Sequence, residues 1–169
     1  MTSRSRELRK EQDRQASWDR MRTTPWSPYD PHGAMGSGTA RIQLIHLPSF
    51  SNPVFWEVCQ LGVQWLLYSS KVVDPGWPTL RVQGYEPVPF DGKRLRSFFD
   101  RLTSLSLPVA PDLSNRAGVD GASTQLALFG DLHSRVRFEW WSEYPPAWQP
   151  LVEIANEMLQ AFAAPASGE

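Results

Sequence analysis

The sequence is poor in residues that bind metals or carry thiol chemistry. Cys59 is the only cysteine, which excludes an internal disulfide and a zinc site made of several cysteines. The three histidines, His32, His46 and His133, stand apart and form no H-E-x-x-H pattern. We therefore expect no metal and no cofactor, a buried apolar role for Cys59, and hydrogen-bonded or solvated roles for the histidines.

Long apolar runs and catalytic motifs are also missing. No stretch approaches the roughly 20 apolar residues that span a bilayer, and the N-terminus is polar and charged, unlike a secretory signal. We expect no membrane segment and a cytoplasmic location. The chain has no Gly-x-Ser-x-Gly turn and no Gly-rich phosphate loop before a helix. Whether it is an enzyme stays open, and a non-enzyme is favoured.

Some acidic residues meet only part of what a calcium-binding loop or a pair of catalytic carboxylates requires. Asp120, before Gly121, and Asp131 lack the alternating oxygen ligands and terminal Glu of a calcium loop. An Asp-Gly pair is typical of a turn. Glu153 and Glu157 are four residues apart on a predicted helix and have no evident partner on another element, so a solvated face is expected.

Aromatic residues, by contrast, are plentiful, with 8 Trp and 8 Phe in 169 residues. Disordered chains are poor in aromatics, so most of this chain should fold. Residues 23–39 hold three prolines and three glycines, which is the composition of a linker. We predict a flexible charged tail and Pro/Gly linker over 1–39 and a single α+β domain over 40–165.

Charge is distributed unevenly between these two parts. Residues 1–22 contain seven basic and four acidic side chains, although the whole chain has a net charge of -1. Weak nucleic-acid binding, if present, is therefore expected in the tail and not in the domain. Arginine outnumbers lysine 14 to 3, which is typical of proteins from GC-rich bacterial genomes.

The first part of the domain is rich in strand patterns. Residues 41–47 predict a strand that is buried on both faces and ends at Pro48. The next segment, 53–73, is ambiguous, because Asn52-Pro53 is a suitable start for a helix. Its apolar residues nevertheless alternate with a period of two, as Cys59, Leu61, Val63, Trp65 and Leu67 do.

We therefore predict an antiparallel strand pair over about 54–60 and 63–73, with a helix as the alternative. A turn at Asp74-Pro75-Gly76 follows. Leu80, Val82 and Tyr85 suggest one more short strand.

Two helices are predicted from apolar residues on one face. The first covers 92–105, with Asp91 as its N-cap, and its apolar face is made of Leu95, Phe98, Phe99, Leu102 and Leu105. The second begins near Trp148 and places Pro150 in its first turn, where a missing amide proton costs nothing. Its apolar face is made of Leu151, Val152, Ala155, Met158, Leu159 and Phe162.

A β-hairpin is predicted between these helices, after a loop over 108–121. Leu126 and Leu128 lie on one face of its first strand, and Val136, Phe138 and Trp140 lie on one face of its second. Side chains alternate along a strand, so burying this second set turns its neighbours outward. We predict that the outward residues bind a partner: Arg135, Arg137, Glu139, Trp141 and, just beyond the strand, Tyr144.

Two further aromatic arrangements bear on this surface. Trp77 is another aromatic expected to project beyond the core. In the alternative arrangement, Trp141 packs against Trp148 at the junction of strand and helix instead of facing solvent.

The order strands, helix, hairpin, helix has no strand–helix–strand alternation to force parallel pairing. We predict an α+β fold: a mainly antiparallel sheet of about five strands, two helices on one face and a wet opposite face. The helix contacts are expected through Phe98, Phe99 and Leu102 on one side and Leu151, Met158 and Leu159 on the other.

The segment DGASTQLALFG…RVRFEWWSEYPPAWQPL pairs an Asp-Gly turn with a hairpin and a helix that starts at Pro and Trp. In this it resembles small bacterial α+β proteins of the immunity-protein type, over about a third of the chain. The resemblance implies a protein-binding role and no particular site residues. The alternatives are a small enzyme that uses His46 or His133 with Asp120 or Glu139, and weak nucleic-acid binding by the tail.

Overall fold

The computed structural model describes residues 7, 9–13, 15–16, 39–75, 80–108, 121–131 and 134–164. The described residues between 7 and 16 are helical and exposed. From residue 39 onward the elements are β1 (Thr39–Pro48), β2 (Val54–Leu61), β3 (Gln64–Asp74), β4 (Arg81–Val88), α2 (Gly92–Thr103), β5 (Ala122–Phe129), β6 (Arg135–Trp140), the 3-10 turn η1 (Pro146–Trp148) and α3 (Gln149–Ala163). His32, Trp77, Asp120 and His133 lie outside the described residues.

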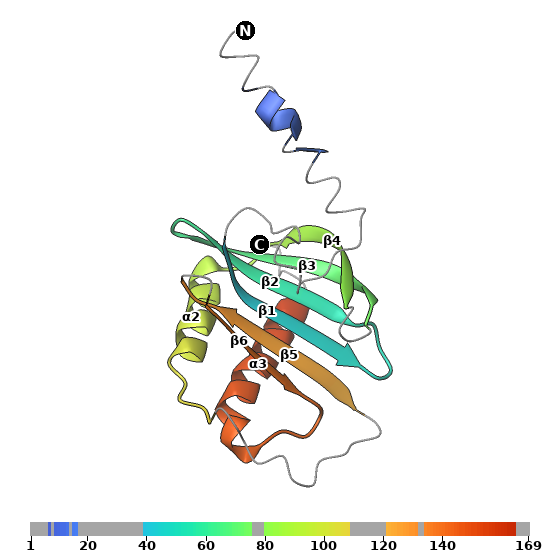
Figure 1. Ribbon diagram of the computed structural model, residues 1–169, viewed down its shortest axis with the longest axis vertical. Helices are drawn as coiled ribbons and strands as arrows, with labels where there is room; N and C mark the ends of the chain where they lie inside the picture. The colour runs from blue at the N-terminus through green and yellow to red at the C-terminus, as the bar shows by residue number, and fades with distance from the viewer. Residues whose placement is uncertain are drawn as a thin grey trace.

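The strands form one open six-stranded sheet in the order β4-β3-β2-β1-β5-β6, and every neighbouring pair is antiparallel. Helices α2 and α3 lie on the same side of this sheet (Figure 1). The predicted fold class is therefore confirmed, with one strand more than the expected number. The boundary between tail and domain remains a prediction, although β1 does begin at Thr39.

The ambiguous segment forms strands and not a helix. β2 and β3 pair from Val54↔Lys71 to Leu61↔Gln64 and are joined by a tight turn at Gly62-Val63. Gly62 has a φ of 60°, a left-handed conformation that other residues adopt only at a cost. The expected single face over Cys59, Leu61, Val63, Trp65 and Leu67 is wrong, however, because a two-residue turn sets Leu61 opposite Gln64 and so changes which residues share a face. Cys59 lies on the side away from the helices, whereas Trp65 and Leu67 pack in the core under them.

The main core lies between the sheet and the two helices. Phe162 of α3 sits at its centre, with its ring centroid 5.9 Å from Trp56, 5.2 Å from Phe90 and 6.0 Å from Phe98. Asp91 caps α2 as predicted, because its carboxylate accepts a hydrogen bond from the Lys93 amide at 2.9 Å. Both helices therefore turn their predicted apolar faces toward the sheet, with Leu95, Phe98 and Leu102 of α2 fully buried.

The expected helix contacts need two corrections. Phe98 and Leu102 are buried, but Phe99 is only half-buried and packs against Trp65, with the ring centroids 5.3 Å apart. Leu159 is likewise only partly buried. Residues 98 and 99 are adjacent and point about 100° apart on a helix, so only one can face the centre of the sheet.

Over β1 to β4, the opposite face of the sheet is not the wet face that we expected. Its residues form two further buried clusters, the first made of Ile45, Phe55, Leu80 and Val82 and the second of Cys59, Tyr68 and Tyr85. β4 shifts register twice against β3, and Gly84 adopts a φ of 78°. These irregularities bend the edge strand (Figure 1), so that side chains of its first half reach residues of β1 and β2.

Candidate functional site

The outer side of β6 is the surface that the sequence predicts to bind a partner. Continuous pairing with β5, from Phe129↔Arg135 to Thr124↔Trp140, fixes which way each side chain points. Phe138 and Trp140 belong to the main core under the helices, whereas Val136, which we expected to be buried with them, is 46% exposed. Arg135, Arg137 and Glu139 therefore lie on the other face, as predicted from the alternation.

These charged residues are ordered by contacts within the hairpin. Arg137 Nη2 lies 2.7 Å from Glu139 Oε2. Gln125 donates to the other oxygen of Glu139 at 3.3 Å. The Arg135 guanidinium lies 5.5 Å from the centroid of the Phe129 ring. Both arginines make further interactions as well, so the surface is preorganised.

The aromatic residues beyond β6 differ from one another in exposure. Trp141 keeps 39% of its surface exposed. An added Cβ at Gly121 would come within 2.7 Å of its indole Nε1, so the indole lies directly against that glycine. Tyr144 is half-buried and donates a hydrogen bond to Gln149 at 2.8 Å.

The alternative pairing of Trp141 with Trp148 is not what the hairpin adopts. Trp148 is buried and meets Phe138 edge-on, with the ring centroids 5.4 Å apart. The structure thus separates a core tryptophan from a surface one.

A second polar group, which we call the Glu57 cluster, was not predicted. It consists of Gln43, Glu57, Cys59 and Tyr85, on the side of the sheet away from the helices. Glu57 is fully buried, and its Oε1 accepts a hydrogen bond from the Tyr85 hydroxyl at 2.6 Å. Its Oε2 accepts one from Gln43 Nε2 at 2.6 Å. A single acid in the apolar strand VFWEVCQL was the only signal of this cluster in the sequence.

Burial in this cluster suppresses acid–base and thiol chemistry. Cys59 is buried, as expected, with its sulfur 3.3 Å from Glu57 Oε1 and 3.3 Å from the Tyr85 hydroxyl. Desolvation, and next the Glu57 carboxylate, raises the pKa of the Cys59 thiol. The same two causes raise the pKa of Tyr85. Both groups stay protonated near neutral pH, so the arrangement favours a structural role over a nucleophile.

His46 is hydrogen-bonded to a threonine, and among the described residues it forms no pair with an aspartate or glutamate. Its Nδ1 lies 3.0 Å from the Thr124 hydroxyl, and burial lowers its pKa. Thr124 pairs with Trp140, whereas Glu139 pairs with Gln125 on the next position. His46 and Glu139 therefore point to opposite faces of the sheet.

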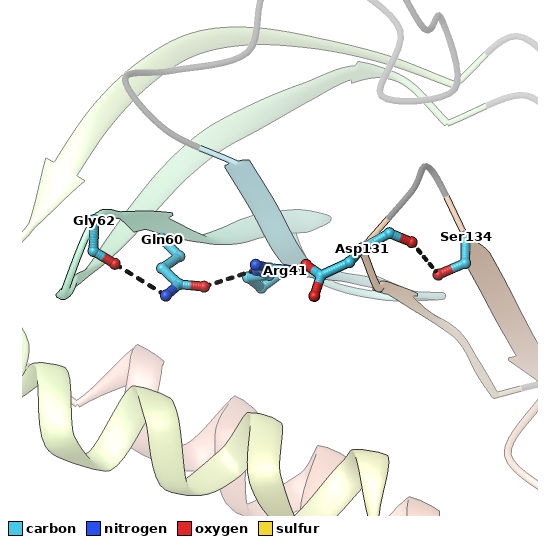
Figure 2. Close-up of polar contacts among 5 residues, drawn as sticks. All are labelled: Arg41, Gln60, Gly62, Asp131 and Ser134. Carbon is cyan, nitrogen blue, oxygen red and sulfur yellow. Dashed lines mark hydrogen bonds and ion pairs between the residues drawn. The ribbon is translucent and has the colours of Figure 1, made fainter.

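Arg41 joins the two hairpin turns at one end of the sheet. Figure 2 shows its guanidinium between Gln60, at 2.9 Å, and Asp131, at 2.8 Å. Gln60 in turn donates to the Gly62 carbonyl at 2.9 Å. The Arg41 side chain is 15% exposed and lies over Phe99, 5.8 Å from the ring centroid. Asp131, considered above as a metal ligand, is therefore part of an ion pair.

Glu157 also differs from its prediction. It does have a partner on another element, since Arg101 Nη1 of α2 lies 2.7 Å from its Oε2 and Arg94 Nη2 lies 3.9 Å from its Oε1. Glu153 accepts a hydrogen bond from Gln149 at 2.8 Å. Glu157 therefore links the two helices, whereas Glu153 is bonded within α3.

One shallow hollow lies along the exposed side of α2, lined by Lys93, Arg96, Ser97, Asp100, Arg101 and Ser104. It contains none of the predicted site residues. Over the described part of the chain, no three His, Cys, Asp or Glu side chains gather in a way that could hold a metal ion.

None of the helices in the described ranges combines the length and the apolar character that crossing a bilayer requires. Comparison with protein-family models, with curated proteins and with solved structures finds no match to this chain.

Proposed function

We propose that the chain is a non-enzymatic protein-binding module of the bacterial cytoplasm, of the immunity-protein type, and that its partner binds on the outer side of β6. The observation that carries this proposal is the edge position of β6, whose outward charges are followed in the chain by an exposed Trp141. Trp and Arg are the residues most enriched among those that dominate binding energy at protein interfaces.

The geometry favours a partner with both charges. Arg137 and Glu139 form an ion pair on the surface, with side chains 21% and 44% exposed. A partner that offers a carboxylate near Arg137 and a donor near Glu139 extends this pair without leaving a buried charge alone. Because contacts within the hairpin already hold these side chains, little side-chain freedom is lost on binding.

The rival functions gain less from the structure. His46 bonds to Thr124 and faces away from Glu139, which gives no support to a histidine–acid pair at this position. Nucleic-acid binding by the tail stays a prediction from its charge, because five of its seven basic residues lie outside the described residues.

The test uses purified products of adjacent genes as candidate partners and calorimetry as the readout. Arg137→Glu and Trp141→Ala should each reduce binding at least tenfold, which is about 1.4 kcal/mol, while the melting temperature stays within a degree or two. Arg96→Glu is the matched control, since Arg96 is exposed on α2 and pairs only loosely with Asp100 at 3.6 Å.

Two results count against the proposal. If Trp141→Ala unfolds the domain, Trp141 is a core residue and the surface does not exist. If Arg96→Glu weakens the complex as much as Arg137→Glu does, the partner does not bind at β6.

A further inference from the structure

The two edges of the sheet are built differently. At one edge, β4 shifts register twice against β3, carries Gly84 at a φ of 78° and contains Pro87. Bulges and prolines of this kind prevent an edge strand from pairing with another chain. At the other edge, β6 pairs with β5 without a register shift and contains neither glycine nor proline. Among the described residues, no strand pairs with the other side of β6.

The residues of β6 are complementary to a second copy of themselves. When two copies pair antiparallel with Phe138 opposite Phe138, Arg137 of each lies opposite Glu139 of the other. Opposite charges at directly paired positions stabilise antiparallel strands. In the same register Arg135 lies opposite Trp141, where a cation–π contact can form.

Neighbouring registers lack this complementarity. Side chains directly opposite must point to the same face, so a symmetric pair must be centred on a residue. Centring on Val136 sets Arg135 against Arg137. Centring on Arg137 or on Glu139 sets that charge against its own copy. Centring on Trp140 brings no like charges together either, but it relies on residues 141–143, beyond the end of β6. Phe138 is therefore the centre that avoids like charges and also sets Arg137 opposite Glu139 within the strand.

We infer that the partner of β6 is a second copy of this chain, joined antiparallel about Phe138 into a sheet continuous across both copies; this rests on the proposed binding role of β6. Arg135 and Arg137 already have contacts within the chain. The inference of a second copy therefore depends on the complementary charges in this register and not on a charge that lacks a partner. Pairing also covers Val136, an apolar residue at this edge that is 46% exposed. One strand pair is a small interface, so the dimer is weak, with a dissociation constant in roughly the micromolar range.

The experiment is sedimentation of the full chain at concentrations up to about 1 mM, well above the expected dissociation constant. The wild-type chain should form a dimer. Arg137→Glu places Glu opposite Glu139 twice and should raise the dissociation constant at least tenfold. The double variant Arg137→Glu/Glu139→Arg reverses both charges and should restore the dimer, and Arg96→Glu should leave it unchanged.

A chain that stays monomeric over this range overturns the inference, as does a dimer that Arg137→Glu leaves unchanged or that the double variant does not restore. Melting temperatures of all variants exclude unfolding as the cause. The proposed function fails separately. A monomer that still binds the product of an adjacent gene through Arg137 and Trp141 keeps the binding surface and removes only the second copy. Loss of both means that β6 is not an interface.

Discussion

Glu57 shows how a charged residue is accommodated deep in this sheet. Its carboxylate accepts hydrogen bonds from Tyr85 and Gln43, each at 2.6 Å, and from the Cys59 thiol at 3.3 Å. A buried carboxylate is costly unless its oxygens are satisfied, and here neutral donors from β1, β2 and β4 satisfy both. The cluster therefore ties these three strands together on the side away from the helices.

The hydrogen bond from the Tyr85 hydroxyl to Glu57 should contribute to the stability of the fold. Tyr85→Phe removes a donor to Glu57 and leaves a buried oxygen with one partner fewer, which should lower the free energy of unfolding by about 1–3 kcal/mol. Tyr144→Phe is the matched control, since its hydroxyl bonds to Gln149 near the surface. Urea denaturation of both variants is the measurement. Equal losses of unfolding free energy in the two variants would show that the buried hydrogen bond to Glu57 stabilises the fold no more than the one from Tyr144 near the surface.

The same cluster predicts a loss of stability in alkali. The thiol pKa of Cys59 is raised from 9.0, and that of the Tyr85 hydroxyl from 10.0, so the folded chain holds both protons more tightly than the unfolded chain. This stabilisation is complete below pH 9 and decreases as the pH rises above 9 and then 10. Urea denaturation at pH 7, 9 and 10.5 should show the decline. Cys59→Ala should make it shallower, and an unchanged slope would contradict the assignment.

At the scale of elements, α2 presents two adjacent phenylalanines to different surroundings. Phe98 is 1% exposed and meets Phe162, whereas Phe99 is half-buried against Trp65 and below the Arg41 guanidinium. The sequence alone did not separate them, because both fall within the apolar arc of a helix. The direction of the helix over the sheet separates them.

Phe98→Ala should therefore lower the free energy of unfolding by about 3–5 kcal/mol, through lost burial and the cavity left behind. Phe99→Ala should cost clearly less, since part of its ring already faces solvent. Guanidinium denaturation of both variants gives the comparison directly. A larger loss for Phe99 would mean that α2 is rotated from the position described.

At the scale of the whole molecule, the tail and the domain are expected to be independent. The described residues between 7 and 16 are helical and exposed, and β1 begins at Thr39. A chain that starts at Met35 should keep its melting temperature. A fall of several degrees, which for a domain of this size corresponds to about 1 kcal/mol, would show that the tail packs on the domain. Differential scanning calorimetry is the measurement.

The sequence alone determined the features that depend on local periodicity and local chemistry. The apolar residues spaced along 92–105 and the residues after Trp148 predicted both helices, and Asp91 predicted the N-cap. The alternation along β6 predicted the outward positions of Arg135, Arg137 and Glu139, because a strand has only two faces. Such patterns need no knowledge of distant residues.

Only the tertiary structure decided which residues meet across the sheet. The Glu57 cluster exists because β2 lies between β1 and β3 and because the irregular β4 brings Tyr85 over the same face. In the sequence, Tyr85 is 28 residues from Glu57. Arg41 and Asp131, 90 residues apart, likewise meet only at the end of the folded sheet. No local pattern records such pairings, since they follow from strand order and from the bending of an edge strand.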